Sequence, residues 1–210
     1  MLYVINFKAY RNGTGKNAVK LAKIIKKVKD KKRKKIIVAV QPTDVPRVSK
    51  IITTFSQHVD PISYGAHTGW ILPEAVKQAG AVGTLLNHSE RKLSYEEIKR
   101  SVKRAREVKL KTIICCSDLD ECKKLSRLKP DYIAIEPPEL IGTGRSVSKE
   151  KPELIARCKK AIEVPLLCGA GITNGEDVKK ARELGADGIL VASAVIKSKN
   201  PGKALLDIIV

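Results

Sequence analysis

The sequence has few aromatic residues, few acidic side chains and no long apolar run. Aromatic residues make up 4% of the 210 positions, and 22 Asp and Glu stand against 41 Lys and Arg. A membrane-spanning helix needs about 20 mostly apolar residues in succession, and no segment meets that requirement. The opening residues MLYVINFKAY show neither the basic leader nor the cleavage site of a secretory signal. We therefore expect a soluble, cytoplasmic protein with no membrane partner.

The five cysteines lack the spacings that bind metal or build a disulfide framework. They form no CxxC pair, and no His-rich tract accompanies them. The sequence therefore predicts reduced thiols in the core, and neither a metal nor a cofactor.

One segment carries a large share of the net charge of +19. Residues 20–35 carry ten Lys or Arg and one acid, Asp30. The segment has no aromatic residue for base stacking and no nucleic-acid-binding motif. A charge run of this kind is usually the solvated face of a helix. We expect no nucleic-acid partner, although the positive field would help to attract an anionic substrate.

Short β-branched runs alternate with amphipathic helical patterns along the whole chain. The predicted strands are 2–7, 36–41, 55–60, 83–88, 111–117, 132–137, 165–170 and 188–193. The predicted helices are 17–31, 45–53, 73–79, 94–109, 119–128, 149–162, 174–184 and 200–209, one after each strand. Ser94 with Glu97, Asn174 with Asp177, and Asn200 before a proline are typical helix starts.

Strict alternation of strand and helix predicts a parallel sheet, because parallel neighbours need a crossover connection. Eight such units in about this length favour a closed (β/α)₈ barrel over an open doubly wound sheet. The absence of GxGxxG after the first strand also counts against a dinucleotide-binding domain. We expect residues 1–210 to form a single barrel domain.

In such a barrel the active site lies at the carboxyl ends of the strands. Asn6 and Lys8 share a face at the end of the first strand, and an inward lysine needs an anionic partner. His88 ends the fourth strand at the start of a helical turn, whose dipole favours a neutral ring. These three residues are therefore candidates for substrate contact.

The sixth strand ends in a carboxylate, Glu136, which could be a buried ion-pair partner or a base with a raised pKa. Pro137 and Pro138 stiffen the chain behind it, and the segment Gly142-Thr143-Gly144 frees it again. Because this pattern is typical of a rigid lid between two hinges, we favour the base.

Small residues follow the last two strands, as Gly169-Ala170-Gly171 and as Ala192-Ser193. They let backbone N–H groups approach a ligand, and these two loops of a barrel frequently bind phosphate. We expect a phosphate site there.

The motifs NxK at 6–8, QH at 57–58, GAHTG at 65–69, NHSER at 87–91, EPPELIGTG at 136–144 and CGAGI at 168–172 resemble the short, archaeal type of triosephosphate isomerase. The resemblance covers essentially the whole chain. It implies interconversion of glyceraldehyde 3-phosphate and dihydroxyacetone phosphate through an enediol, without cofactor or metal.

By this resemblance Glu136 is the general base and His88 the neutral electrophile. Lys8 and Asn6 bind the substrate, and Glu90 holds Lys8. Backbone N–H groups at Gly142, Gly169, Ala170, Gly171, Ala192 and Ser193 hold the phosphate.

The resemblance also implies a homodimer or homotetramer. The GAHTG loop, with Thr68 at its tip and Trp70 as an anchor, would reach into a neighbouring subunit. Cys168, the pair Ala192-Ser193 and Glu139 depart from bacterial and eukaryotic members, so the latching of the lid should differ in detail.

Two other readings remain open from the residues alone. Another phosphate-binding barrel enzyme, of the indole-glycerol-phosphate synthase or ribulose-phosphate epimerase type, would share the last two strands. Its pattern would not combine NHSER with EPPELIGTG. A non-catalytic barrel could instead bind anions or nucleic acid through residues 20–35.

Overall fold

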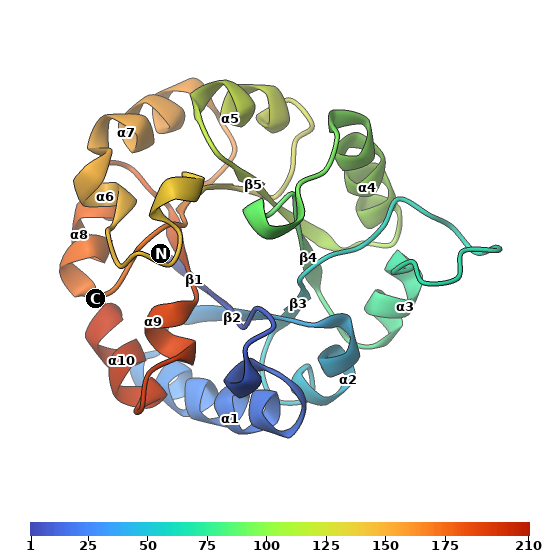
Figure 1. The fold of residues 1–210 in the computed structure, drawn as a ribbon, viewed down its shortest axis with the longest axis horizontal. Helices are drawn as coiled ribbons and strands as arrows, with labels where there is room; N and C mark the ends of the chain where they lie inside the picture. The colour runs from blue at the N-terminus through green and yellow to red at the C-terminus, as the bar shows by residue number, and fades with distance from the viewer.

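The structure, a computed structural model, describes all residues 1–210 and contains a closed barrel of eight parallel strands in chain order (Figure 1). The first strand pairs with the second and with the eighth. The strands are β1 (Leu2–Asn6), β2 (Lys35–Val40), β3 (Thr54–Ser56), β4 (Gly83–Leu86), β5 (Lys111–Cys116), β6 (Tyr132–Ile135), β7 (Leu166–Cys168) and β8 (Gly188–Val191). The predicted (β/α)₈ fold is confirmed.

Each strand ends before its predicted last residue. His88 and Glu136 consequently lie in the loops just past β4 and β6 rather than in the strands. The apolar pattern continues beyond the last ladder hydrogen bond, because loop residues at the mouth of the barrel are also buried.

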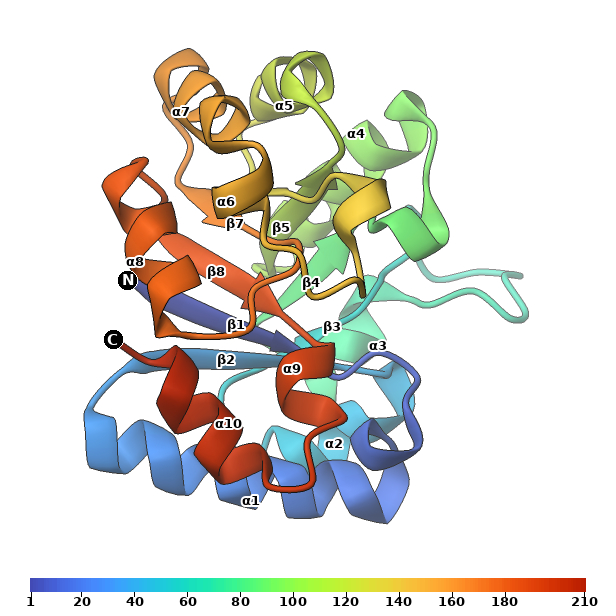
Figure 2. The ribbon, with the colours of Figure 1, turned by 60° about the vertical axis from the view of Figure 1, so that its left-hand side comes forward.

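Ten helices surround the barrel, and in both views α10 lies along α1 (Figures 1 and 2). They are α1 (Gly15–Lys32), α2 (Val45–Val48), α3 (Pro73–Gln78), α4 (Tyr95–Glu107), α5 (Leu119–Ser126), α6 (Val147–Glu150), α7 (Pro152–Ala161), α8 (Gly175–Glu183), α9 (Ser193–Ile196) and α10 (Pro201–Ile208). Short 3₁₀ turns are η1 (Arg11–Gly13), η2 (Pro42–Asp44), η3 (Ser89–Arg91) and η4 (Pro138–Leu140).

The prediction of one helix per strand is wrong after β6 and β8, where the short helices α6 and α9 come first. Pro152 separates α6 from α7, because proline disfavours helical geometry in the residue before it. Lys151 accordingly has φ −139° and ψ 56°.

The predicted helix starts are confirmed. Ser94 with Glu97, and Asn174 with Asp177, form capping boxes in which each side chain accepts from the other residue's backbone. Asn200 accepts from the backbone of Lys203 at the start of α10. These caps satisfy N–H groups that the first helical turn leaves free.

Charges are arranged by helix direction. The helix α4 begins with Glu96 and Glu97 and carries Arg104 and Arg106 in its last turn, and α5, α7 and α8 show the same order of signs. Acids at the N-terminus and cations at the C-terminus both stabilise the helix dipole. Because every helix starts near the carboxyl ends of the strands, many of the cations gather at the opposite end of the barrel.

The core has two layers. Ten residues fill the barrel interior, among them Leu2, Val4 and Phe55, while a larger cluster packs between the strands and the helices. At Gly83 a Cβ atom would lie 2.4 Å from the Phe55 ring, so this position has no room for a side chain. Side chains therefore fill the interior, and a ligand can bind only at the mouth. None of the helices is both long and apolar enough to span a membrane.

Candidate active site

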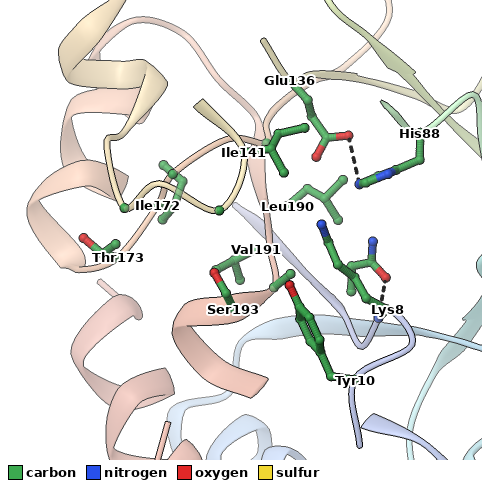
Figure 3. A pocket seen from close by; sticks show the side chains of 16 residues that line it. Lys8, Tyr10, His88, Glu136, Ile141, Ile172, Thr173, Leu190, Val191 and Ser193 are labelled. Carbon is green, nitrogen blue, oxygen red and sulfur yellow. Dashed lines mark hydrogen bonds and ion pairs between the residues drawn. The ribbon is translucent and has the colours of Figure 1, made fainter. Parts of the chain in front are cut away.

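One pocket at the carboxyl ends of the strands brings together residues from loops far apart in the sequence (Figure 3). Lys8, His88 and Glu136 lie on one side of it, and Asn6 is also among the residues that line it. The loops after β7 and β8 form the other side. The four polar residues predicted from three strand ends thus lie around one space.

Glu136 is buried, with 4% of its surface exposed. Its backbone N–H donates to the carbonyl of Cys116 at 2.8 Å, which fixes it to the end of β5. Its Oε2 atom has no hydrogen-bond partner and lies 3.8 Å from His88 Nε2. Burial raises the pKa of Glu136, and a charged His88 ring, the Cys115 thiol and Lys8 oppose that rise. A dry carboxylate facing a cavity is suited to accept a proton.

His88 caps the turn η3, and its Nδ1 accepts the backbone N–H of Glu90 at 3.1 Å. A ring nitrogen that accepts an N–H carries no proton itself. The hydrogen bond thus assigns a neutral ring with its proton on Nε2, the atom that points toward Glu136. The Nε2 proton can therefore be donated to a ligand oxygen that lies between the side chains of His88 and Glu136.

Lys8 has a left-handed backbone with φ 49°, and its side chain is 8% exposed. Its Nζ contacts Glu90 Oε1 at 2.6 Å, as the resemblance implied. The backbone N–H of Lys8 donates to Asn6 Oδ1 at 3.0 Å. Because an ammonium has three donors and Glu90 is partly solvated, Nζ can also bind a substrate oxygen.

Gln57 was not among the predicted site residues. Its amide donates to Asn6 Oδ1 at 3.2 Å and to the carbonyl of Lys8 at 3.0 Å. It therefore ties the end of β3 to the turn that carries Lys8. The QH motif at 57–58 marks its position, but its contacts depend on how the strands pair, which no local pattern shows.

The other side of the pocket contains Gly142, Gly169, Gly171, Ala192 and Ser193. A Cβ atom on Gly171 would lie 1.8 Å from the carbonyl oxygen of Arg145, and its φ of 67° favours glycine as well. At Gly169 a Cβ would lie 2.3 Å from Glu136 Cγ. These glycines bring the backbone close both to the pocket and to the carboxylate.

Ala170 does not line the pocket. Its side chain is 1% exposed, and its carbonyl accepts the backbone N–H of Val147 at 3.1 Å. Gly169 and Gly171 face the cavity, whereas the residue between them faces α6. Gly144, predicted as part of the second hinge, also lines the pocket, whereas the sequence missed Tyr10 and Thr173, which line it as well.

Residues 136–144 form the predicted lid segment. Pro138–Leu140 form the rigid turn η4, and Thr143 Oγ1 donates to the carbonyl of Leu140 at 2.9 Å. Gly142 and Gly144 both have φ 77°, a left-handed conformation that glycine adopts most readily. Glu139 makes an ion pair with Lys151.

Thr68 and Trp70 lie outside the pocket, in a loop between β3 and α3 that projects from the body of the molecule (Figure 1). We call residues 61–70 the finger. Both residues are exposed, Trp70 to 53%, and its ring centroid lies 6.3 Å from that of His67.

The base of the finger is held by hydrogen bonds. The backbone N–H of Asp60 donates to the carbonyl of Ile71 at 2.9 Å, and the N–H of Ile71 donates to Asp60 Oδ2 at 2.6 Å. Asp60 Oδ1 also contacts His58 Nε2 at 2.9 Å and Arg91 at 3.3 Å. Burial lowers the pKa of His58. The finger is therefore connected to the turn that carries His88.

The chain has no group of three or more His, Cys, Asp or Glu side chains placed as metal ligands. All five cysteines are buried, free thiols.

Comparison with known proteins gives a consistent result. Residues 1–210 match the family described as triosephosphate isomerase. The chain is 51% identical to the triosephosphate isomerase of Sulfurisphaera tokodaii, over 100% of this chain and 94% of that protein. It is 50% identical to that of Saccharolobus solfataricus, over 99% and 94%. It is 43% identical to that of Methanocaldococcus jannaschii, over 100% and 99%. The crystal structure of triosephosphate isomerase from Bartonella henselae shares the fold, with a TM-score of 0.69 and 21% identity over 93% of each chain.

Proposed function

Because this chain belongs to the triosephosphate isomerase family, we propose that Glu136, His88 and Lys8 carry out its isomerisation chemistry. The enzyme interconverts D-glyceraldehyde 3-phosphate and dihydroxyacetone phosphate, a step of glycolysis and gluconeogenesis. One observation carries the assignment of residues. The unpartnered Oε2 of Glu136 lies 3.8 Å from the ring nitrogen of His88 that bears the proton.

Glu136 is the base in this proposal. It takes a proton from the carbon that bears a hydroxyl beside the carbonyl, and it returns the proton to the neighbouring carbon. As the C–H bond breaks, a C=C bond forms and the carbonyl oxygen gains negative charge. His88 donates its Nε2 proton to that oxygen. It regains a proton from the neighbouring hydroxyl as that group becomes the new carbonyl, so the ring is neutral again at the end, a division of roles that follows the family's acid–base pair. Burial suits Glu136 to this task, because a raised pKa makes a stronger base.

Lys8 and Asn6 bind the substrate and stabilise the oxyanion. The Lys8 ammonium lies in a largely buried position, where its interaction with a developing negative charge is stronger than in water. Glu90 and Gln57 hold the side chain and the backbone of Lys8.

The phosphate binds backbone N–H groups of the glycine-rich side, at Gly142, Gly171, Ala192 and Ser193. The predicted N–H of Gly169 is not free for this, because it donates to the carbonyl of Ile135 at 3.0 Å. The lid closes over it and excludes water, which protects the enediol from losing phosphate by elimination. Ala170 is left out of this set because it does not line the pocket and its carbonyl accepts the N–H of Val147 at the start of α6.

A coupled assay on dihydroxyacetone phosphate tests the base. Glu136→Gln keeps the shape of the side chain and should lower kcat by about 10²- to 10⁴-fold, the usual contribution of general-base catalysis. Glu139→Gln, an exposed carboxylate on the same lid, is the control and should retain most activity. Unchanged turnover in Glu136→Gln would remove Glu136 from the mechanism.

We also propose that the enzyme acts as a homodimer, or as a homotetramer built from two such dimers. A second cavity lies beside the catalytic one, and Lys8, Gln57, His88, Glu90 and Arg91 are among the residues that line it. The finger of a second copy would fill this cavity and steady Lys8 and His88, with Trp70 as an apolar anchor.

Light scattering with activity measurement tests this assembly. Trp70→Ala should shift the enzyme toward a monomer and lower kcat together. Ile24→Ala, which changes an exposed apolar residue on α1 instead, should do neither. A fully active wild-type monomer would refute the assembly.

We also propose that the enzyme works in the cytoplasm, since its five cysteines are free thiols, as in reducing compartments. The whole chain would act as one domain, because β1 closes the barrel against β8. The family match replaces the other phosphate-binding barrel classes and the non-catalytic reading that the residues alone left open.

A further inference from the structure

Asn87, the residue before His88, has a left-handed backbone with φ 58°. Glycine would meet this backbone requirement without steric cost, whereas asparagine is one of the few other residues that adopt it readily. A side chain at this position therefore needs a reason beyond the turn itself. Its amide is 2% exposed, and all its hydrogen-bonding atoms are in use.

The Asn87 side chain closes the turn that carries His88. Its Oδ1 accepts the backbone N–H of Leu93 at 3.0 Å, so one residue joins the start and the end of segment 88–92. Its Nδ2 donates to the carbonyl of Cys115 at 2.9 Å and to Glu121 Oε1 at 2.9 Å. The turn is thereby fastened to the end of β5 and to α5.

Glu121 connects this network to a second point of the same segment. Its carboxylate accepts from Lys92 Nζ at 2.7 Å and from the backbone N–H of Ser117 at 2.7 Å. These donors lower the pKa of Glu121, although burial opposes them. One carboxylate therefore contacts both Asn87 and Lys92, the residues that flank segment 88–91.

The ring of His88 depends on the shape of this segment. The bond that removes the proton from Nδ1 comes from the backbone of Glu90, two residues along the turn. If the turn loosens, this N–H moves away and the proton is free to occupy either nitrogen. A proton on Nδ1 could not be donated to a substrate oxygen that lies between His88 and Glu136.

We propose that Asn87, held by Glu121, is a positioning residue that fixes the Nε2–H tautomer and the orientation of His88. This inference rests on the proposed function of His88 as the electrophile. Asn87 does not touch the substrate, since it does not line the pocket. Asn87 therefore acts on the His88 ring by fixing the shape of segment 88–92.

The test uses Asn87→Gly, which keeps the left-handed backbone and removes all three hydrogen bonds. We expect kcat to fall between about 10- and 100-fold, the scale of a small misplacement of a catalytic group. KM should change little, because the phosphate loops lie elsewhere. Lys109→Gly is the matched control, since Lys109 also has φ 58° and is exposed away from the site. It should leave kcat unchanged.

Nitrogen-15 NMR of the ring nitrogens reports the tautomer of His88 directly. If Asn87 contributed only to the stability of the fold, its substitution would leave that tautomer unchanged. The chain has three histidines, so His88 can be assigned by its loss in His88→Gln. The wild type should show a single neutral Nε2–H tautomer at His88, and Asn87→Gly a mixture of both. Should Asn87→Gly fail to fold, Glu121→Ala removes the partner of Asn87 and should show the same mixture. Glu121→Gln, which retains an acceptor, should restore much of kcat relative to Glu121→Ala.

The two proposals fail differently. Full activity in His88→Gln would overturn the role of His88, whatever its tautomer. A single unchanged tautomer in both Asn87→Gly and Glu121→Ala would overturn the role of Asn87, even if His88 proved essential.

Discussion

Glu136 is a buried carboxylate with an unpartnered oxygen, and this should reduce the stability of the fold. Burial raises the pKa of Glu136 above its ordinary value of about 4.3. The folded state then binds the proton more tightly than the unfolded state, so stability falls as the pH rises from the unfolded pKa through the folded one. Glu136→Gln should therefore melt at a higher temperature than the wild type at pH near 7.

Scanning calorimetry at two pH values checks this. The difference should shrink at pH near 4, where the wild-type carboxyl is also protonated. Glu163→Gln, at an exposed carboxylate, should shift stability by less than about 0.5 kcal/mol. A lower melting temperature for Glu136→Gln at both pH values would contradict the argument.

The same raised pKa sets the pH dependence of catalysis. Glu136 must be ionised to accept a proton, so kcat/KM should decline on the acid side. The midpoint should lie above about 4.3, the ordinary value for a glutamate. A pH profile of kcat/KM measures it, and a midpoint at or below that value would show that lysine and histidine neighbours outweigh burial.

The sequence predicted the site residues that lie at strand ends. It missed the roles of residues that act through contacts between strands. Asn6, Lys8 and His88 stand out because a polar side chain follows an apolar run. Asn87 and Gln57 have partners on other strands, which no local pattern identifies. The first group is marked by neighbours in the sequence, whereas the role of the second group depends on contacts that form only in the folded chain.

Among the elements, the loop after β7 shows how two neighbouring glycines serve different purposes. A Cβ on Gly171 would meet the backbone of Arg145, which cannot move easily. A Cβ on Gly169 would meet the side chain of Glu136, which can rotate. Gly171→Ala should therefore destabilise the fold, by about 1 to 3 kcal/mol or more, while Gly169→Ala should fold and lose kcat.

Denaturant melts and steady-state kinetics of both variants separate these effects. The opposite pattern, a stable and active Gly169→Ala, would mean that Glu136 does not need its present position. Gly142→Ala offers a third comparison. No atom lies within 4 Å of its added Cβ, so only the left-handed backbone opposes it.

Element boundaries were predictable in type but not in detail. All eight strands and seven of the predicted helices were found, because each repeats its own period. Of the predicted helix 45–53, only the four residues of α2 are helical. The separate short helices α6 and α9 were missed, since four residues carry no periodic signal.

At the scale of the whole molecule, the core protects every thiol. Burial raises the pKa of Cys115 and Cys168, so these groups stay protonated and unreactive. Titration with a thiol reagent should find almost no reactive group in the native enzyme and five after denaturation. Rapid reaction of one thiol in the native state would reveal an opening of the core that the closed barrel does not suggest.

The order of charges along the helices makes the two ends of the barrel differ in charge. The acids in the first turns of α4 and α5 lie toward the catalytic mouth, and many of the cations, including those that end α1, lie toward the opposite end. On a negatively charged support the enzyme should adsorb by its cationic end and leave the mouth facing the solution. A sheet of immobilised enzyme would then keep its catalytic power without any engineered tether.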